Sequence, residues 1–226
     1  MFRVLAATAL LFAFSLHASA QQAARGNWFV YCGKAQLAPR RHLHHEVQYR
    51  TARTTRHLRQ LLLRTGVGYD LGAGNEAPLR WSALAGYAYL GSRRFEPDAE
   101  REVVRSREHR VYQELTARHR FGRFSLRHRG RFEQRFFDDA FRLRYRYSLA
   151  VKVALSKPQM QDHTLYAAAS NEVFVQSGEQ HFDHNRVYGG LGYCLSKHLR
   201  AELRYLVQML TRGHRDQTTF LLVCSF

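Results

Sequence analysis

Arginines recur at every second position in the middle of the chain, and their type and spacing favour the recognition of anionic groups. Arg127, Arg129 and Arg131 form one such series, and 142–146 contains a second. In a strand, a period of two places these side chains on one face. A guanidinium pairs bidentately with a carboxylate or another oxyanion. The charged face predicted from this spacing comprises nine arginines and four glutamates: Arg110, Glu114, Arg127, Arg129, Arg131, Glu133, Arg142, Arg144, Arg146, Glu172, Arg186, Glu202 and Arg204.

Serines and histidines could also support nucleophilic catalysis, and histidines could bind a metal ion. Several serines and thirteen histidines make chance pairs easy, but none has a spacing typical of a lipid hydrolase or acyltransferase. The histidine clusters at 42–45 and 181–184 could chelate a divalent ion, although exposed polar residues near turns are the simpler interpretation. We therefore predict no catalytic residue, no metal and no cofactor.

The stretches 124–136 and 141–149 carry the clearest strand signal, because arginines alternate with aromatic and aliphatic residues in both. The first stretch also shows an i+4 repeat that is typical of an amphipathic helix. A helix would scatter its arginines around the axis, and Gly122 and Gly130 would weaken it. We therefore predict two strands joined by a short turn at 137–140.

The same alternation continues along most of the chain and predicts an all-β, antiparallel up-and-down barrel. Eleven strands can be counted, but single-chain bacterial barrels have even numbers. We therefore expect one strand near 28–71 to be split or missed, and ten to twelve strands in total. The expected strands are 27–37, 43–51, 58–71, 79–90, 108–120, 124–136, 141–155, 165–175, 186–195, 199–210 and 218–226.

The connections between these strands differ in length. The segment 91–107 is rich in charge and contains Pro97, which predicts a long external loop whose arginines could contact lipopolysaccharide phosphate. Tight turns are expected after residues 120, 155 and 195, and long ones after 90 and 175. Short turns at one end and long loops at the other are typical of outer-membrane barrels. A final strand ending in an aromatic residue, here Phe226, is also typical of them and is read by the barrel-assembly machinery.

Residues 1–20 have the pattern of a cleaved signal peptide. A short basic start is followed by a nearly apolar run over 4–16, and Ala18-Ser19-Ala20 fits a cleavage site. The apolar run is shorter than the ~20 residues that a spanning helix needs. Nothing beyond it resembles such a helix. We expect an exported mature chain, residues 21–226, that forms one barrel.

The formal net charge of +17 comes almost entirely from arginine. Such a charge usually suggests nucleic acid or an anionic surface as the partner. Here the arginines lie inside strands of an exported chain and are mixed with glutamates, which argues against nucleic acid.

Three cysteines, Cys32, Cys194 and Cys224, leave at least one thiol unpaired. Cys32 and Cys224 fall in the first and last strands, so a disulfide that closes the barrel is one alternative. The favoured interpretation is that all three are small apolar residues.

The apolar faces require a covering, and lipid fits them better than a second sheet. The strands are long, aromatic residues are abundant, and the opposite faces carry Arg and Glu where a solvated sheet would carry Ser, Thr and Lys. We therefore predict an outer-membrane barrel whose charged face lines the lumen. A soluble periplasmic lipocalin-like barrel is the alternative fold.

Several motifs resemble those of the domain of unknown function 2490 family: Glu108-His109-Arg110, Arg129-x-Arg131-x-Glu133-Gln134-Arg135-Phe136, Phe141-Arg142-x-Arg144-Tyr145-Arg146, Asn171-Glu172-x-Phe174 and Asn185-Arg186-x-Tyr188-x-Gly190-Leu191-Gly192-Tyr193. The resemblance implies a bacterial outer-membrane barrel and brings no established activity.

Function is predicted here from the lumen alone. With nine arginines against four glutamates, we expect a narrow anion-preferring channel or a barrel filled by its own side chains. An outer-membrane lipid-modifying enzyme is the alternative. The expected partners are outer-membrane lipid, lipopolysaccharide and the assembly machinery.

Overall fold

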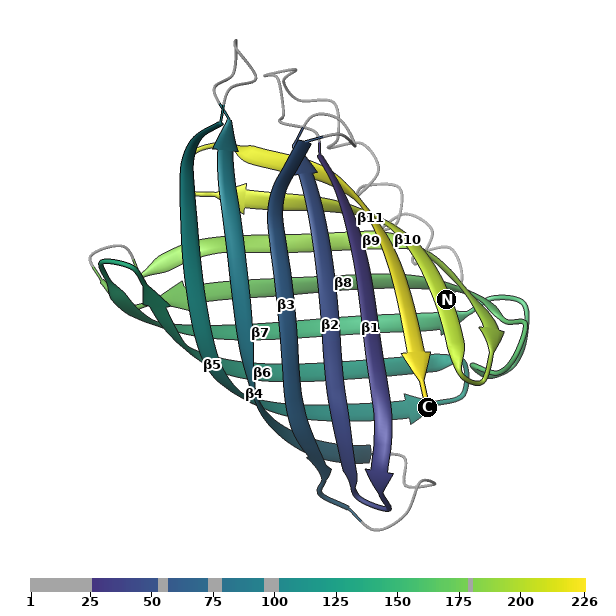
Figure 1. Cartoon of the computed structure of the whole chain (residues 1–226). Coiled ribbons are helices and arrows are strands. Elements are labelled where there is room, and N and C mark those ends of the chain that lie inside the picture. The colour runs from purple at the N-terminus through teal and green to yellow at the C-terminus, as the bar shows by residue number, and fades with distance from the viewer. Residues whose placement is uncertain (1–25, 53–56, 73–78, 96–101, 179–180) are drawn as a thin grey trace.

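The computed structural model describes residues 26–52, 57–72, 79–95, 102–178 and 181–226. These residues form a closed barrel of eleven strands (Figure 1), which confirms the predicted all-β barrel. The predicted signal peptide, residues 1–20, lies outside the described residues. The strands are β1 (Gly26–Ala38), β2 (Arg41–Ala52), β3 (His57–Asp70), β4 (Leu79–Phe95), β5 (Glu102–Phe121), β6 (Phe124–Phe137), β7 (Phe141–Ala154), β8 (Leu165–Gln176), β9 (Phe182–Ser196), β10 (Leu199–Leu210) and β11 (His214–Ser225).

The barrel closes through a parallel pair, β1 with β11. Gly26 is opposite Gln217 at one end of this pair, and Lys34 is opposite Ser225 at the other. All other neighbouring strands are antiparallel. An up-and-down barrel with an odd number of strands must close in this way, because its first and last strands run in the same direction. The expectation of a strand split or missed near 28–71 is therefore wrong for the described residues.

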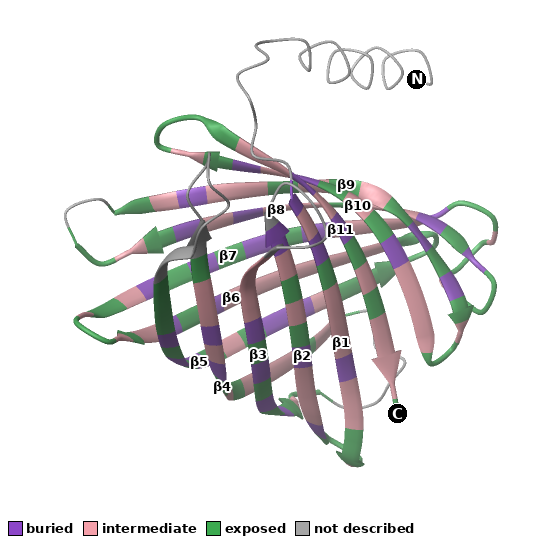
Figure 2. Cartoon of the chain, turned by 45° about the horizontal axis from the view of Figure 1, so that its top comes forward, coloured by how far each residue is buried: buried purple, intermediate pink, exposed green. Residues whose placement is uncertain are grey.

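Successive side chains point alternately outward and inward, which explains why these residues form strands. In β7, Tyr145 and Tyr147 are exposed on the outside, whereas Arg144 and Arg146 are buried inside. Figure 2 shows this alternation as bands of exposed and buried residues along the strands. Aromatic rings also stack between strands on the outer face. Phe29 and Phe220 do so across the parallel closure, with ring centroids 5.2 Å apart.

Strands β4 and β5 project beyond their neighbours at one end of the barrel. Strand β3 pairs with β4 only as far as Ser92, and β6 pairs with β5 only as far as Glu108. β4 and β5 nevertheless pair with each other up to Phe95 and Glu102. The prediction of a long loop over 91–107 is therefore wrong, because most of that segment extends the two strands.

The direction of β11 distinguishes the two ends of the barrel. We call the end at which β11 finishes the C-terminal end; it carries the connections 39–40, 71–78, 122–123, 155–164 and 197–198. The opposite end carries the connections 53–56, 96–101, 138–140, 177–181 and 211–213. The tight turn predicted after residue 155 is wrong, because 155–164 is the longest of these connections.

Candidate functional site

An interior cavity of about 1210 Å³ runs along the barrel. Its lining includes Ser225 near the C-terminal end, and Ser92 and Arg215 near the opposite end. Eleven of the thirteen residues predicted for the charged face line it: Arg110, Glu114, Arg127, Arg129, Arg131, Arg144, Arg146, Glu172, Arg186, Glu202 and Arg204. The other two differ, since Glu133 is only 1% exposed beneath its arginine partners and Arg142 is exposed near the opposite end.

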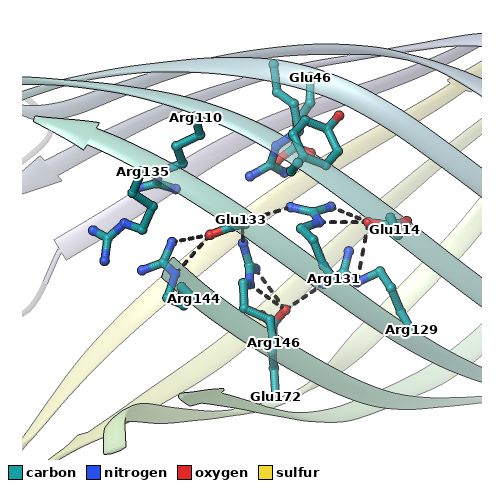
Figure 3. Close-up of polar contacts among 12 residues, drawn as sticks. Glu46, Arg110, Glu114, Arg129, Arg131, Glu133, Arg135, Arg144, Arg146 and Glu172 are labelled. Carbon is teal, nitrogen blue, oxygen red and sulfur yellow. Dashed lines mark hydrogen bonds and ion pairs between the residues drawn. The ribbon is translucent and has the colours of Figure 1, made fainter. Parts of the chain in front are cut away.

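Three arginines and three glutamates form a closed ring of alternating charges on the inner wall, which we call the ion-pair ring (Figure 3). Arg131 lies 2.5 Å from Glu114 and 3.7 Å from Glu133. Arg146 lies 2.8 Å from Glu133 and 2.8 Å from Glu172. Arg129 completes the ring, 2.7 Å from Glu172 and 4.0 Å from Glu114.

The register of β5, β6 and β7 produces this ring. Glu114 is directly opposite Arg131 across β5 and β6. Arg131 is in turn directly opposite Arg146 across β6 and β7, a pairing of like charges that is repulsive by itself. Glu133 lies beside both arginines and accounts for their proximity. Because each ring residue contacts two groups of opposite charge, the cost of removing its charge from water is offset.

Tyr112 of β5 lies between the ion-pair ring and a second ion pair on β2 and β3. The guanidinium carbons of Arg131 and Arg64 lie 4.8 Å and 5.5 Å from the centre of its buried ring. Arg64 is also 2.7 Å from Glu46. Gly86 leaves room for the phenol, since a Cβ at that position would lie 2.7 Å from the Tyr112 hydroxyl oxygen.

Further charged groups flank the ion-pair ring towards both ends. Towards the opposite end, Arg110 Nε donates to Glu108 at 2.6 Å. Towards the C-terminal end, the buried carboxylate of Glu202 on β10 accepts hydrogen bonds from Lys152 of β7 at 2.5 Å and from Tyr166 of β8 at 2.8 Å. The strands β7 and β10 are not neighbours, so the Lys152–Glu202 contact connects separate parts of the wall.

Arg186 of β9 makes a similar connection through aromatic rings. Its guanidinium carbon lies 4.6 Å from the ring centre of Phe174 on β8 and 5.1 Å from that of Trp28 on β1. Arg50 of β2 also stacks on Trp28, at 3.9 Å. Cation–π contacts of this kind are favourable, and stronger where water is excluded. The side chains of Arg186, Trp28 and Arg50 narrow the lumen between strands β8–β9 and strands β1–β2.

The charged face includes residues that the sequence argument did not select. Glu46, Arg64 and Glu108 have the same period-two spacing, and applying the alternation to every strand would have found them. Tyr112 lies on the same face, but it was not selected because the charged face was defined by Arg and Glu residues. Asp183, 3.2 Å from Arg144, could not be found by spacing, because it lies within a register irregularity between β8 and β9, where Phe174 is opposite His184 and Val175 is opposite Phe182.

The family model described as protein of unknown function, DUF2490, matches residues 25–219. The chain belongs to this family. The match covers all but the end of the described barrel and confirms the resemblance inferred from its motifs. A comparison with curated proteins gives no match. No helix among the described residues is long and apolar enough to cross a membrane.

In this DUF2490 barrel, the candidate metal ligands point in different directions. His42 and His44 line the cavity, whereas His45 contacts the hydroxyl of Tyr31 at 3.0 Å on the outer face. In the described ranges, no three or more side chains of His, Cys, Asp and Glu are arranged to hold a metal ion.

All three cysteines are free thiols. Cys32 is opposite Val223, whereas Cys224 is opposite Gly33, so the two thiols leave the β1–β11 pair on opposite faces. The alternative of a disulfide that closes the barrel is therefore wrong.

Proposed function

We propose that this protein is an outer-membrane barrel of a Gram-negative bacterium and provides a narrow, anion-preferring aqueous path. The charge of the cavity carries the proposal. In the described part of the chain, twenty Lys and Arg side chains and seven Asp and Glu side chains line it. A surplus of fixed positive charge inside a low-dielectric wall raises the local concentration of anions and lowers that of cations.

The outer face supports a location in lipid. Every described strand exposes large apolar side chains on this face, among them Trp81, Phe132, Tyr145 and Leu203. Soluble monomers rarely expose apolar patches larger than a few hundred Å². A closed barrel also pairs the backbone groups of its strands, as the interior of a bilayer requires.

Localisation and partners follow from this proposal. We infer export through the signal peptide at 1–20, insertion by the barrel-assembly machinery and contact with outer-membrane lipid. The projecting β4–β5 hairpin carries Arg93, Arg105 and Arg107 and is the proposed contact for lipopolysaccharide phosphate. The protein is proposed to act without enzymatic activity, cofactor or nucleic acid.

A filled structural barrel is the second candidate. The ion-pair ring and the Arg186–Trp28 contact favour it, because these side chains occupy part of the lumen.

Two measurements test these proposals. The mature chain is refolded in mild detergent, and unheated and boiled samples are compared on a gel. A folded band that shifts on boiling supports a membrane barrel, whereas a monomer that is soluble without detergent contradicts it. The protein is then reconstituted into liposomes loaded with a small anion or a small cation. Faster release of the anion supports the channel, and no release of either supports the filled barrel.

A further inference from the structure

Three arginines occupy directly paired positions on three neighbouring strands near the C-terminal end. Arg80 of β4 is opposite Arg118 of β5, and Arg118 is opposite Arg127 of β6. All three line the cavity, together with Arg120 and Arg200. Directly opposite residues have Cβ atoms roughly 4.5–5.5 Å apart, so like charges in such positions repel each other. We call these five residues the arginine cluster.

The arginine cluster lies on two separate parts of the lumen wall. Arg118 of β5 lies within electrostatic range of Arg200, which comes from β10 on another part of the wall. Arg127 likewise lies within range of Arg204 of β10. Strands β5 and β6 are separated from β10 by several strands in the barrel. The positive charges therefore converge on the cavity from two directions.

Three members of the cluster, Arg118, Arg127 and Arg200, differ from the arginines of the ion-pair ring. Each ring arginine contacts two carboxylates. Within the ranges that the structure describes, Arg118, Arg127 and Arg200 form no ion pair with a carboxylate. Glu114 and Glu172 attract Arg127 electrostatically, but only at longer range. Both carboxylates form their ion pairs with arginines of the ring. These three half-buried arginines thus face a cavity that reaches the barrel end.

We propose that the arginine cluster binds a multivalent oxyanion of the phosphate class, either free phosphate or a small phosphate monoester. Several guanidinium groups that converge can each donate two parallel hydrogen bonds to a tetrahedral oxyanion. A doubly charged ligand also reduces the repulsion among the arginines of the cluster more than a single chloride ion does. Most exposed large apolar side chains lie on the outside of the barrel, and twenty basic side chains line the cavity, so the cavity suits a soluble phosphate better than a headgroup attached to acyl chains.

This inference deepens the proposed function by naming the anion, and it rests on that function only where transport is concerned. Binding requires a folded barrel and no membrane. It is therefore measured in detergent, where a failure to bind phosphate is distinct from a failure to conduct.

Isothermal titration calorimetry with inorganic phosphate, at constant ionic strength in chloride buffer, tests the proposal. The wild type should bind saturably, and Arg118→Gln/Arg127→Gln should bind at least tenfold more weakly. Arg142→Gln/Arg212→Gln removes the same charge from exposed positions near the opposite end and should bind as the wild type does. The heat-dependent gel shift verifies that each variant folds, and Arg118→Gln alone replaces the double variant if that does not fold.

A second readout separates a binding role from a structural one. In phosphate-free buffer, Arg118→Gln/Arg127→Gln should unfold at a higher temperature than the wild type, because repulsion within the row is removed. Phosphate should then raise the unfolding temperature of the wild type only. The proposal is overturned if the wild type shows no saturable phosphate binding, or if the control pair loses binding equally. Binding confined to a short-chain phosphatidic acid would also overturn it, since that result identifies a lipid-headgroup site.

Discussion

Arg146 lies between Glu133 and Glu172, with a guanidinium nitrogen 2.8 Å from a carboxylate oxygen of each. Both carboxylates are almost fully buried. Arg146→Met removes the cation that they share and leaves two buried negative charges with fewer partners. We expect the free energy of unfolding to fall by about 3–5 kcal/mol, the usual cost of breaking a buried ion pair. Urea unfolding in detergent, followed by tryptophan fluorescence, measures this loss.

Arg142→Met is the matched control for that substitution. Arg142 lies on the same face of the same strand, but it is exposed near the opposite end of the barrel. We expect its replacement to change the free energy of unfolding by less than about 0.5 kcal/mol. Equal losses in the two variants would show that the ring contributes nothing beyond net charge.

Glu114 makes the ion-pair ring testable by charge reversal. Its carboxylate accepts from Arg131 at 2.5 Å and lies 4.0 Å from Arg129. Glu114→Arg places like charges together and should destabilise the barrel, whereas Glu114→Arg/Arg131→Glu restores one opposite pair. A double-mutant cycle should give a coupling energy within the usual range of about 0.5–3 kcal/mol. Unchanged unfolding of Glu114→Arg would be incompatible with a ladder of paired charges.

Substitution of two glycines of β4, one beside Tyr112 and one distant from it, tests how tightly Tyr112 is packed. A Cβ at Gly86 would lie 2.2 Å from the carbonyl oxygen of Thr65 and 2.7 Å from the Tyr112 hydroxyl, whereas at Gly91 the nearest atom is 3.5 Å away. We expect Gly86→Ala to lower the free energy of unfolding by about 1–3 kcal/mol, as overpacking does. Gly91→Ala should unfold like the wild type. The reverse order of stability would exclude the close contact at Gly86.

The parallel closure of β1 on β11 is testable by cysteine cross-linking. Val30 is directly opposite Leu221. In a background where Cys32, Cys194 and Cys224 are replaced by serine, Val30→Cys/Leu221→Cys should form a disulfide on mild oxidation. The pair Val30→Cys/Val223→Cys is offset by two positions and should not. Gel mobility with and without reductant reports both outcomes, and preferential cross-linking of the offset pair would contradict the register.

The alternation of residue types was sufficient to predict the barrel, because each strand has one apolar and one charged face. It also predicted the facing of Arg129, Arg131 and Glu133. Spacing within a strand says nothing about which residues of other strands lie opposite, so the closed ring could not be predicted. The same limit explains why the Lys152–Glu202 contact was missed.

Strand number and strand ends were harder to predict than facing. The count of eleven was correct, but the preference of bacterial barrels for even numbers led to the wrong expectation of a missed strand. The charged residues in 91–107 indicated a loop, yet those that the structure describes lie on the projecting β4–β5 strand pair, where both faces of the strands can carry charge.

The reversal potential of single channels in a planar bilayer, under a tenfold gradient of KCl, tests the proposed function most directly. A lumen with twenty basic and seven acidic side chains should pass chloride in preference to potassium, so the current should reverse close to the chloride equilibrium potential. Reversal close to the potassium equilibrium potential, or no conductance from protein shown to be inserted, would contradict the account.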